Sequence, residues 1–241
     1  MAVRAVYPPA CLACGELTDE AHGLCGPCWR DAGFLLGALV CDLCGAPLPG
    51  RDEGAVAHCD DCLAVARPWE RGRAVLPYRG TGRALALALK HGDCTDLAKP
   101  LGRWMARAAR PILADLHGEA VLVPVPLHWT RLFARRHNQA ALLARSAGAA
   151  LGLPVRPDAL VRRRRTASLG RQGREERHAA MADAIGPHPR RARALEGRVV
   201  VLVDDVMTSG ATLAAAARAA REGGAAGVRV LVLARALRGE E

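Results

Sequence analysis

The chain has 241 residues, of which 51% are apolar and only 3% are aromatic. That length suits a small metal module beside one α/β domain, with a core built mainly from Ala, Leu and Val. The formal net charge of +10 favours polyanionic partners, such as nucleic acid or a pyrophosphate-bearing compound, although an arginine-rich genome would explain part of it. The longest early apolar run, residues 32–40, is too short to span a bilayer. We therefore expect a soluble, cytoplasmic protein without membrane insertion.

Eight of the nine cysteines form four Cys-x-x-Cys pairs, and the ninth, Cys94, is expected to be a small buried apolar residue. Two thiolates at this spacing bind one metal from a tight turn, and two such pairs complete a tetrahedral zinc site. The segments 11–15 and 41–45 resemble each other, which indicates a duplicated unit. We predict two structural zinc ions in a double zinc-ribbon module of residues 1–67. The ligands would be Cys11, Cys14, Cys25, Cys28, Cys41, Cys44, Cys59 and Cys62.

The pairing of these cysteines and the role of the module stay open. A sequential assignment gives one zinc the first two pairs, whereas a cross-braced assignment joins the first pair with the third. Disulfides are disfavoured because residues 1–10 contain no apolar segment of a secretory signal. The module is either a docking surface for nucleic acid or protein, or a folding staple for a segment with little core. Removing zinc should unfold the module and leave ligand binding by the rest of the chain largely intact.

Residues 68–241 are expected to form a second domain, an α/β fold with a parallel sheet flanked by helices. Residues 68–78 contain the linker and the first strand. Helices are predicted over residues 81–90 and 96–109, the second of them ended by Pro111. Residues 120–126 then form a second buried strand whose prolines mark its end.

A basic segment follows this strand. Arg131, Arg135 and Arg136 lie just past a strand's carboxyl end, where a second anionic group of a bound ligand would fall. The alternative is a solvated basic face. A helix is predicted next, from Asn138 to about Leu151.

The most informative stretch predicts a strand, a loop and a helix. Residues 199–203 are apolar and mostly β-branched, as in a strand buried on both faces, and Asp204 and Asp205 follow them. A polar loop, residues 208–212, leads into a helix that stops at Gly223. The helix dipole and free N–H groups favour a phosphate there, and the two acids can accept hydrogen bonds from a diol. Together they suit a ribose 5-phosphate; the alternative is an ordinary Rossmann-like strand and turn.

This stretch closely resembles the motif by which type I phosphoribosyltransferases bind phosphoribosyl pyrophosphate (PRPP). The resemblance implies that Asp204 and Asp205 hold the ribose hydroxyls and that the loop cradles the 5-phosphate. As catalytic groups, the two acids would position the sugar, while magnesium with Arg131 or Arg135 would stabilise the leaving pyrophosphate. The PRPP-binding residues would be Asp204, Asp205, Val206, Met207, Thr208, Ser209, Gly210, Ala211, Thr212, Arg135, Asn138 and Gln139.

Almost the whole chain resembles the ComF family of competence proteins. The resemblance rests on the double zinc ribbon, on Val-Pro-Val-Pro-Leu at residues 123–127, on residues 135–139 and on the loop at residues 203–212. That family usually has Arg-Gly-aromatic-Asn-Gln in the middle segment, so Arg136 and His137 depart from its pattern. It also implies a mobile hood over residues 160–185, for which a disordered basic loop is the alternative. The hood positions that match are Arg162, Thr166, Glu176 and Arg177, and Leu169 replaces the usual glutamine.

The resemblance implies a PRPP-binding protein of DNA uptake and natural transformation. It would act on or near single-stranded DNA and beside DNA-processing proteins. Two alternatives stay open: a metabolic phosphoribosyltransferase of nucleobase or nucleotide salvage, and a non-catalytic PRPP sensor. Thr208 occupies the position at which purine-salvage relatives carry the acid that takes a proton from the incoming base. The sequence therefore names no acceptor and leaves enzymatic activity open.

Overall fold

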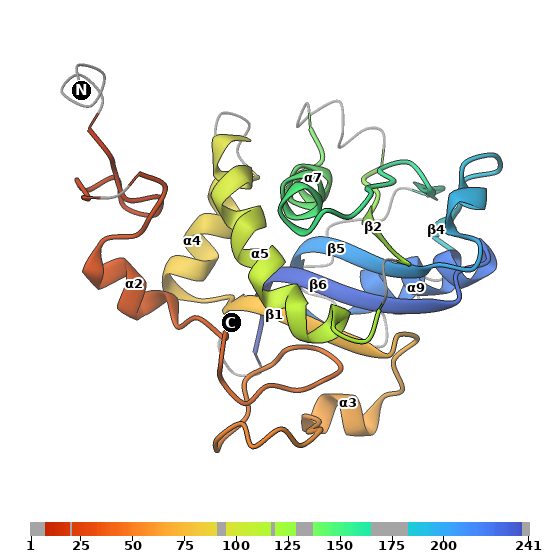
Figure 1. Cartoon of the computed structure of the whole chain (residues 1–241), viewed down its shortest axis with the longest axis horizontal. Coiled ribbons are helices and arrows are strands. Elements are labelled where there is room, and N and C mark those ends of the chain that lie inside the picture. The colour runs from red at the N-terminus through yellow and green to blue at the C-terminus, as the bar shows by residue number, and fades with distance from the viewer. Residues whose placement is uncertain are drawn as a thin grey trace.

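A four-stranded parallel sheet forms the centre of the computed structural model, which describes residues 8–19, 21–90, 95–116, 119–128, 137–164 and 183–237. The strand order is β1-β6-β5-β2 (Figure 1). The expected α/β fold with a parallel sheet is confirmed. The strands are β1 (Arg71–Pro77), β2 (Ala120–Pro124), β5 (Val199–Met207) and β6 (Gly227–Arg235).

Helices cover both faces of this sheet. One face carries α4 (Gly80–Ala88), α5 (Ala98–Leu113) and α7 (Gln139–Leu151), with the short η1 (Thr95–Leu97) leading into α5. The opposite face carries α9 (Ala211–Glu222), which packs against a two-stranded antiparallel ribbon, β3 (Leu160–Arg162) and β4 (Ile185–Pro187). The short η2 (Ala192–Leu195) precedes β5. Within the described ranges, no helix combines the length and the apolarity that a membrane crossing needs.

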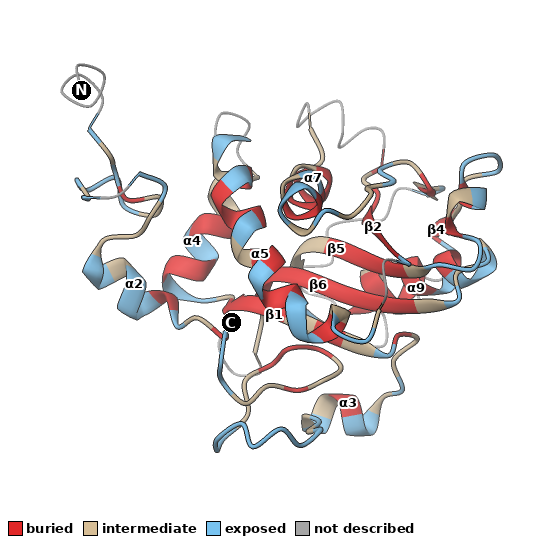
Figure 2. Ribbon diagram, in the orientation of Figure 1, coloured by how far each residue is buried: buried red, intermediate tan, exposed pale blue. Residues whose placement is uncertain are grey.

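The strands alternate between two apolar cores, one on each face of the sheet. Val201 and Val203 of β5 join the core beneath α5 and α7, whereas Val200 and Leu202 join the core beneath α9. A run buried on both faces is what a central parallel strand requires. Figure 2 shows the strands and the inner sides of the helices as the buried part of the molecule.

The cysteine-rich segment contributes two short helices, α2 (Gly26–Ala32) and α3 (Asp60–Ala64). Asp31 of α2 accepts hydrogen bonds from the Thr81 N–H (2.6 Å) and hydroxyl (2.7 Å) at the start of α4. Residues 41–62 pack on the α9 face, where Cys41, Cys44 and Cys62 belong to the same apolar core as the strands. Residues 41–62, called the second knuckle below, therefore cover this part of the sheet in place of a long helix (Figure 1).

Three features of residues 68–241 differ from the sequence-based expectations. Strand β5 continues to Met207, so both acids lie within the strand. Helix α5 runs through Pro111 to Leu113, because the lost N–H lies near the helix end and fully buried Ile112 anchors the last turn. Arginines satisfy its final carbonyls, since Arg71 donates to Pro111 O (2.9 Å) and Arg229 donates to Ile112 O. Strand β6, between β1 and β5, was not predicted, although its apolar run is typical of a buried strand.

Candidate functional site: a pocket at the strand ends and two cysteine clusters

The sheet changes the direction of its connections between β2 and β5. The chain leaving β2 forms α7 on one face, whereas the chain leaving β5 forms α9 on the other. Loops that diverge in this way open a crevice at the carboxyl ends of neighbouring strands, which is where open α/β sheets bind ligands. The register pairs Pro124 with Val203, so the end of β2 lies beside the residues just before the two acids.

A pocket of about 280 Å³ fills this crevice. Its walls come from the end of β5, the start of α9, the segment after β2, the start of α7, the second residue after α4 and the strand β3. The lining combines carboxylates, cations, amides and one hydroxyl, a mixture suited to a ligand that carries both phosphates and hydroxyls. The lining residues are Lys90, Val125, Leu127, Asn138, Gln139, Ala140, Arg162, Asp204, Asp205, Val206 and Thr212.

The two acids form the floor of the pocket, and the backbone fixes both. Asp204 Oδ1 accepts the N–H of Asp205 at 2.9 Å, and Asp205 Oδ1 accepts the N–H of Val206 at 2.8 Å. Desolvation raises the pKa of Asp204 well above 3.8, and the neighbouring charge of Asp205 raises it further. An acid held in this way favours a ligand that brings hydrogen-bond donors or positive charge.

Lys90 supplies a cation to the same pocket, and sequence reasoning missed it. Its Nζ lies 3.4 Å from Asp205 Oδ2, and the positive charge acts to lower the pKa of Asp204. The composition could have drawn attention to Lys90, because Lys90 and Lys99 are the only lysines among the 34 lysine and arginine residues. Arg162, which the family resemblance had marked, also lines the pocket from β3.

The two amides at the start of α7 have different roles. Asn138 caps the helix by accepting the Ala141 N–H (3.4 Å), and its Nδ2 donates to Val125 O at the end of β2 (3.0 Å). Gln139 is 2% exposed, and its Nε2 has no hydrogen-bond partner among the residues that the structure describes. A buried donor without a partner is costly, so Gln139 offers an N–H₂ group that a ligand in this pocket can satisfy.

The remaining predicted loop residues lie beside the pocket rather than in its lining. Thr208 is exposed and Ser209 half-buried, while Gly210 has φ +81° immediately before α9. Met207 and Ala211 are buried in the core, so only their backbone groups are placed to line a ligand site. Arg131 and Arg135 lie outside the described residues, as do Arg136, Cys94 and the hood positions Thr166, Leu169, Glu176 and Arg177.

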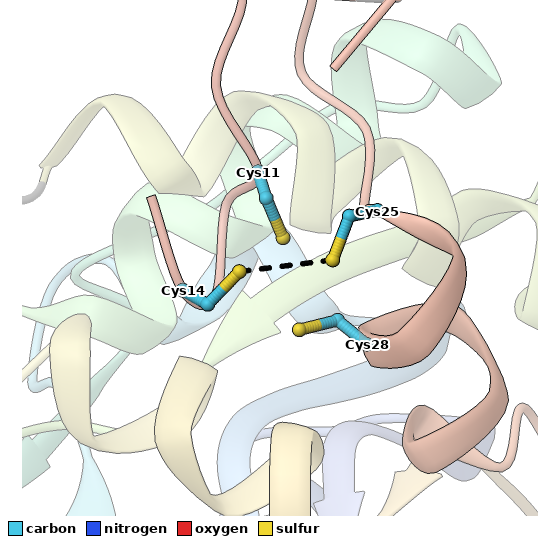
Figure 3. A group of neighbouring side chains, drawn as sticks. All are labelled: Cys11, Cys14, Cys25 and Cys28. Carbon is cyan, nitrogen blue, oxygen red and sulfur yellow. Dashed lines mark hydrogen bonds between the residues drawn. The ribbon is translucent and has the colours of Figure 1, made fainter. Parts of the chain in front are cut away.

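The cysteines gather into two clusters of four. Cys11, Cys14, Cys25 and Cys28 form one, with the four sulfurs pointing toward a common centre (Figure 3), and Cys41, Cys44, Cys59 and Cys62 form the other. In each cluster all sulfurs lie within 4.8 Å of one another. A tetrahedral zinc with Zn–S bonds of about 2.3 Å needs sulfurs about 3.8 Å apart, close to the 3.7 Å between Cys14 and Cys25 and the 3.6 Å between Cys44 and Cys59. The donor sets fit zinc, and the sequential assignment is confirmed over the cross-braced one.

The two clusters repeat one backbone design. Gly15 N donates to Cys11 O (3.0 Å) and Gly45 N to Cys41 O (2.8 Å), and both glycines have a positive φ that closes the turn. In the second cluster, hydrogen bonds from Cys44 and Cys62 lower the pKa of Cys41 to about 3, and the bond to Cys41 raises that of Cys62. One thiolate, the form that binds zinc, is thus already stabilised there.

Comparisons with known proteins match both halves of the chain. Residues 2–63 match the double zinc ribbon domain family, and residues 137–241 match the phosphoribosyl transferase domain family. DNA utilization protein YhgH of Escherichia coli K12 is 29% identical over 239 residues, which cover 95% of this chain and 98% of that protein. Competence protein F of Haemophilus influenzae is 26% identical over 229 residues, covering 94% and 96%. Among solved structures, a hypoxanthine phosphoribosyltransferase from Staphylococcus aureus covers 65% of this chain and 77% of its own, with 9% identity and a TM-score of 0.34.

Proposed function

Because the chain belongs to the ComF family, we propose that it is a PRPP-binding protein of DNA uptake, acting in the cytoplasm on or beside single-stranded DNA. In this proposal residues 1–67 form the zinc-ribbon module and residues 68–241 the phosphoribosyltransferase-like domain. The observation that carries the PRPP site is the pocket between β2 and β5, which joins two acids to two cations and an unpartnered amide.

Different residues of the pocket suit different parts of PRPP. Asp204 and Asp205 hold the ribose hydroxyls, while the N–H groups and hydroxyls of residues 208–212 hold the 5-phosphate at the start of α9. Lys90, whose Nζ lies 3.4 Å from Asp205 Oδ2, and Arg162 line the same pocket and suit the pyrophosphate. Magnesium bound with PRPP would neutralise charge on the leaving pyrophosphate, and Asp204 and Asp205 are the carboxylates on hand to hold it. Arg131 and Arg135 stay part of the proposed site.

Calorimetric titration of the zinc-loaded protein with PRPP and magnesium tests this site. Asp204→Asn/Asp205→Asn should weaken binding by roughly 100-fold or more, because the ribose hydroxyls lose both carboxyl acceptors. The matched control is Asp52→Asn/Glu53→Gln, which removes the same charge from an exposed loop far along the chain. Equal affinity of the two double variants would refute the assignment.

The DNA part of the proposal rests on the names of the relatives and on the net charge of +10. Binding of a fluorescent single-stranded oligonucleotide should weaken steeply as salt is raised, since neutralised phosphates release counterions on binding. A DNA affinity that does not change with salt, or no DNA binding at low salt, would refute the DNA part of the proposal without affecting the PRPP assignment.

A second observation favours catalysis over sensing. A cavity of about 510 Å³ adjoins the PRPP pocket and shares Leu127, Asn138 and Arg162 with it, so a second substrate could lie beside the ribose. Catalysis would then be attack of that substrate's nucleophile on C1 of the ribose, with the C1–O bond breaking and pyrophosphate leaving. Nucleobases and single-stranded DNA should be tested as acceptors by pyrophosphate release from PRPP. Release with a base alone indicates salvage, release with DNA indicates a modifying enzyme, and release with neither indicates a sensor.

A further inference from the structure

Two arginines connect the second cysteine cluster to the loop that precedes α9. Arg67 Nε donates to Cys62 Sγ (3.5 Å), while its Nη1 donates to Ser209 O (2.9 Å). Arg235 is 3% exposed; its Nη1 donates to Met207 O (3.2 Å) and Thr208 O (2.7 Å), and its Nη2 lies 3.9 Å from Asp61 Oδ2. Cys62 is a predicted zinc ligand and Asp61 precedes it in α3. The last carbonyl of β5 and the first two of the loop are thus held by Arg67, which contacts the cluster at Cys62, and by Arg235, which lies near Asp61 next to that cysteine.

Arg67 packs closely against Trp69 and Gly210. Its guanidinium carbon lies 5.5 Å from the centre of the Trp69 ring, and Trp69 Nε1 donates to Leu43 O (2.6 Å), between the cysteines of the third pair. A Cβ added to Gly210 would lie 3.0 Å from Arg67 Nη1 and 3.3 Å from Trp69 Cη2. The loop therefore rests directly on this stacked pair, and a side chain at position 210 would have to displace it slightly.

The direction of the Thr208 and Ser209 carbonyls determines which way the N–H groups of the following residues point. In a planar trans peptide the C=O and the following N–H point in opposite directions, and the described chain has no cis peptide. Because the carbonyls of Thr208 and Ser209 point at the arginines, the N–H groups of Ser209 and Gly210 point away from them. Successive N–H groups turned to one side form an anion-binding concavity.

We propose that Arg67 and Arg235 are positioning residues through which zinc at Cys41, Cys44, Cys59 and Cys62 sets the phosphate loop in its binding shape. The proposal rests on the proposed PRPP site. Zinc fixes the Cys62 sulfur as a thiolate, which strengthens the charge-assisted bond from Arg67. Loss of metal from this cluster frees that sulfur and with it the guanidinium that holds Ser209. PRPP affinity is therefore coupled to the second zinc and not to the first.

The test is calorimetry of the full, zinc-loaded chain with PRPP and magnesium. Arg67→Met, which keeps the stem but removes every donor, should weaken PRPP binding about tenfold, and Arg67→Lys should recover part of it. The matched control is Arg71→Met: Arg71 also bonds to the second knuckle, through Asp42 (3.1 Å), but it does not contact the loop. Its PRPP affinity should equal that of the wild type. Zinc content of two ions per chain shows that each variant keeps both clusters.

If the two sites are coupled, PRPP binding must also change the environment of the second metal, because coupling between sites is reciprocal. An arginine that only stabilises the fold would not produce this change. In cadmium-substituted wild-type protein, PRPP should shift the cadmium resonance of the second cluster and leave that of the first unchanged. In Arg67→Met, or in Arg67→Lys should the first variant fail to fold, the second resonance should move much less. A wild type that does not bind PRPP refutes the proposed function itself. A wild type that binds PRPP with no shift, or with equal weakening by Arg67→Met and Arg71→Met, refutes only the coupling.

Discussion

Single residues of the pocket are placed for ligand binding at the expense of stability. Asp204 lies in a desolvated position beside another acid, and Gln139 keeps an amide donor without a partner. Both arrangements cost free energy in the folded protein and are relieved when a ligand brings the missing partner. Such residues are expected to show opposite effects on stability and on binding when they are replaced.

Asp204→Asn should stabilise the chain while it removes PRPP binding. With its pKa raised above 3.8, folded Asp204 retains a proton that the unfolded chain releases, so its contribution to stability falls as pH rises through the raised pKa. Asparagine does not titrate, and the melting-temperature gain over wild type should therefore grow as pH rises above about 4. Calorimetric scans across this range, with Asp52→Asn as the exposed control, measure it. A variant that melts below wild type at neutral pH contradicts the interpretation.

At the scale of elements, the second knuckle and β1 approach each other backbone to backbone. Gly72 N donates to Asp42 O (2.7 Å), and a Cβ on Gly72 would lie 2.3 Å from Leu43 O. The Arg71 and Arg73 guanidiniums bind the Asp42 carboxylate; burial acts to raise its pKa, but the two arginines outweigh burial and lower it. Glycines at the contact and arginines around it thus attach the knuckle to the sheet.

Gly45→Ala and Gly15→Ala separate this contact from the cost of the turn itself. The two glycines close equivalent turns with φ of +71° and +80°, so alanine should cost about 1 kcal/mol at either. Only at Gly45 would the new Cβ meet backbone, at 2.4 Å from Ala74 N, whereas nothing lies within 4 Å at Gly15. Denaturant unfolding should therefore show a loss of about 3 kcal/mol or more for Gly45→Ala. Similar losses for both variants would mean that the knuckle is not packed on β1.

Across the whole molecule, the second cysteine cluster belongs to the core of the sheet. Cys41 and Cys44 are fully buried in the apolar cluster that contains Val200, Leu202 and Val230. The expectation that zinc removal spares ligand binding by the rest of the chain does not fit this packing, because the sheet would lose part of the cover on its α9 face. The first cluster is less integrated, with Cys14 exposed.

Single cysteine substitutions should show this asymmetry. Cys44→Ser should lower zinc content by one ion and remove hydrogen-exchange protection from β1 and β6, since their α9-side core is opened. Cys14→Ser should also lose one ion, with exchange changing mainly in residues 8–32 and around the start of α4, where Asp31 binds. Hydrogen exchange followed by mass spectrometry separates the two patterns. Identical protection of β6 in both variants would argue for independent modules.

The sequence by itself determined the chemistry and the local elements. Cysteine spacing fixed which residues can bind zinc, since Cys-x-x-Cys constrains two sulfurs locally. The apolar run into Asp204, with Gly210 before α9, fixed the strand, the acids and the polar loop of residues 208–212, because these depend on neighbours in the chain. The tertiary structure alone decided what meets across the chain. It brought Lys90 and Arg162 to the two acids, opened the crevice where α7 and α9 diverge, and placed Arg67 between a cysteine and the loop. Contacts between residues dozens of positions apart depend on strand order and packing, which no local pattern encodes.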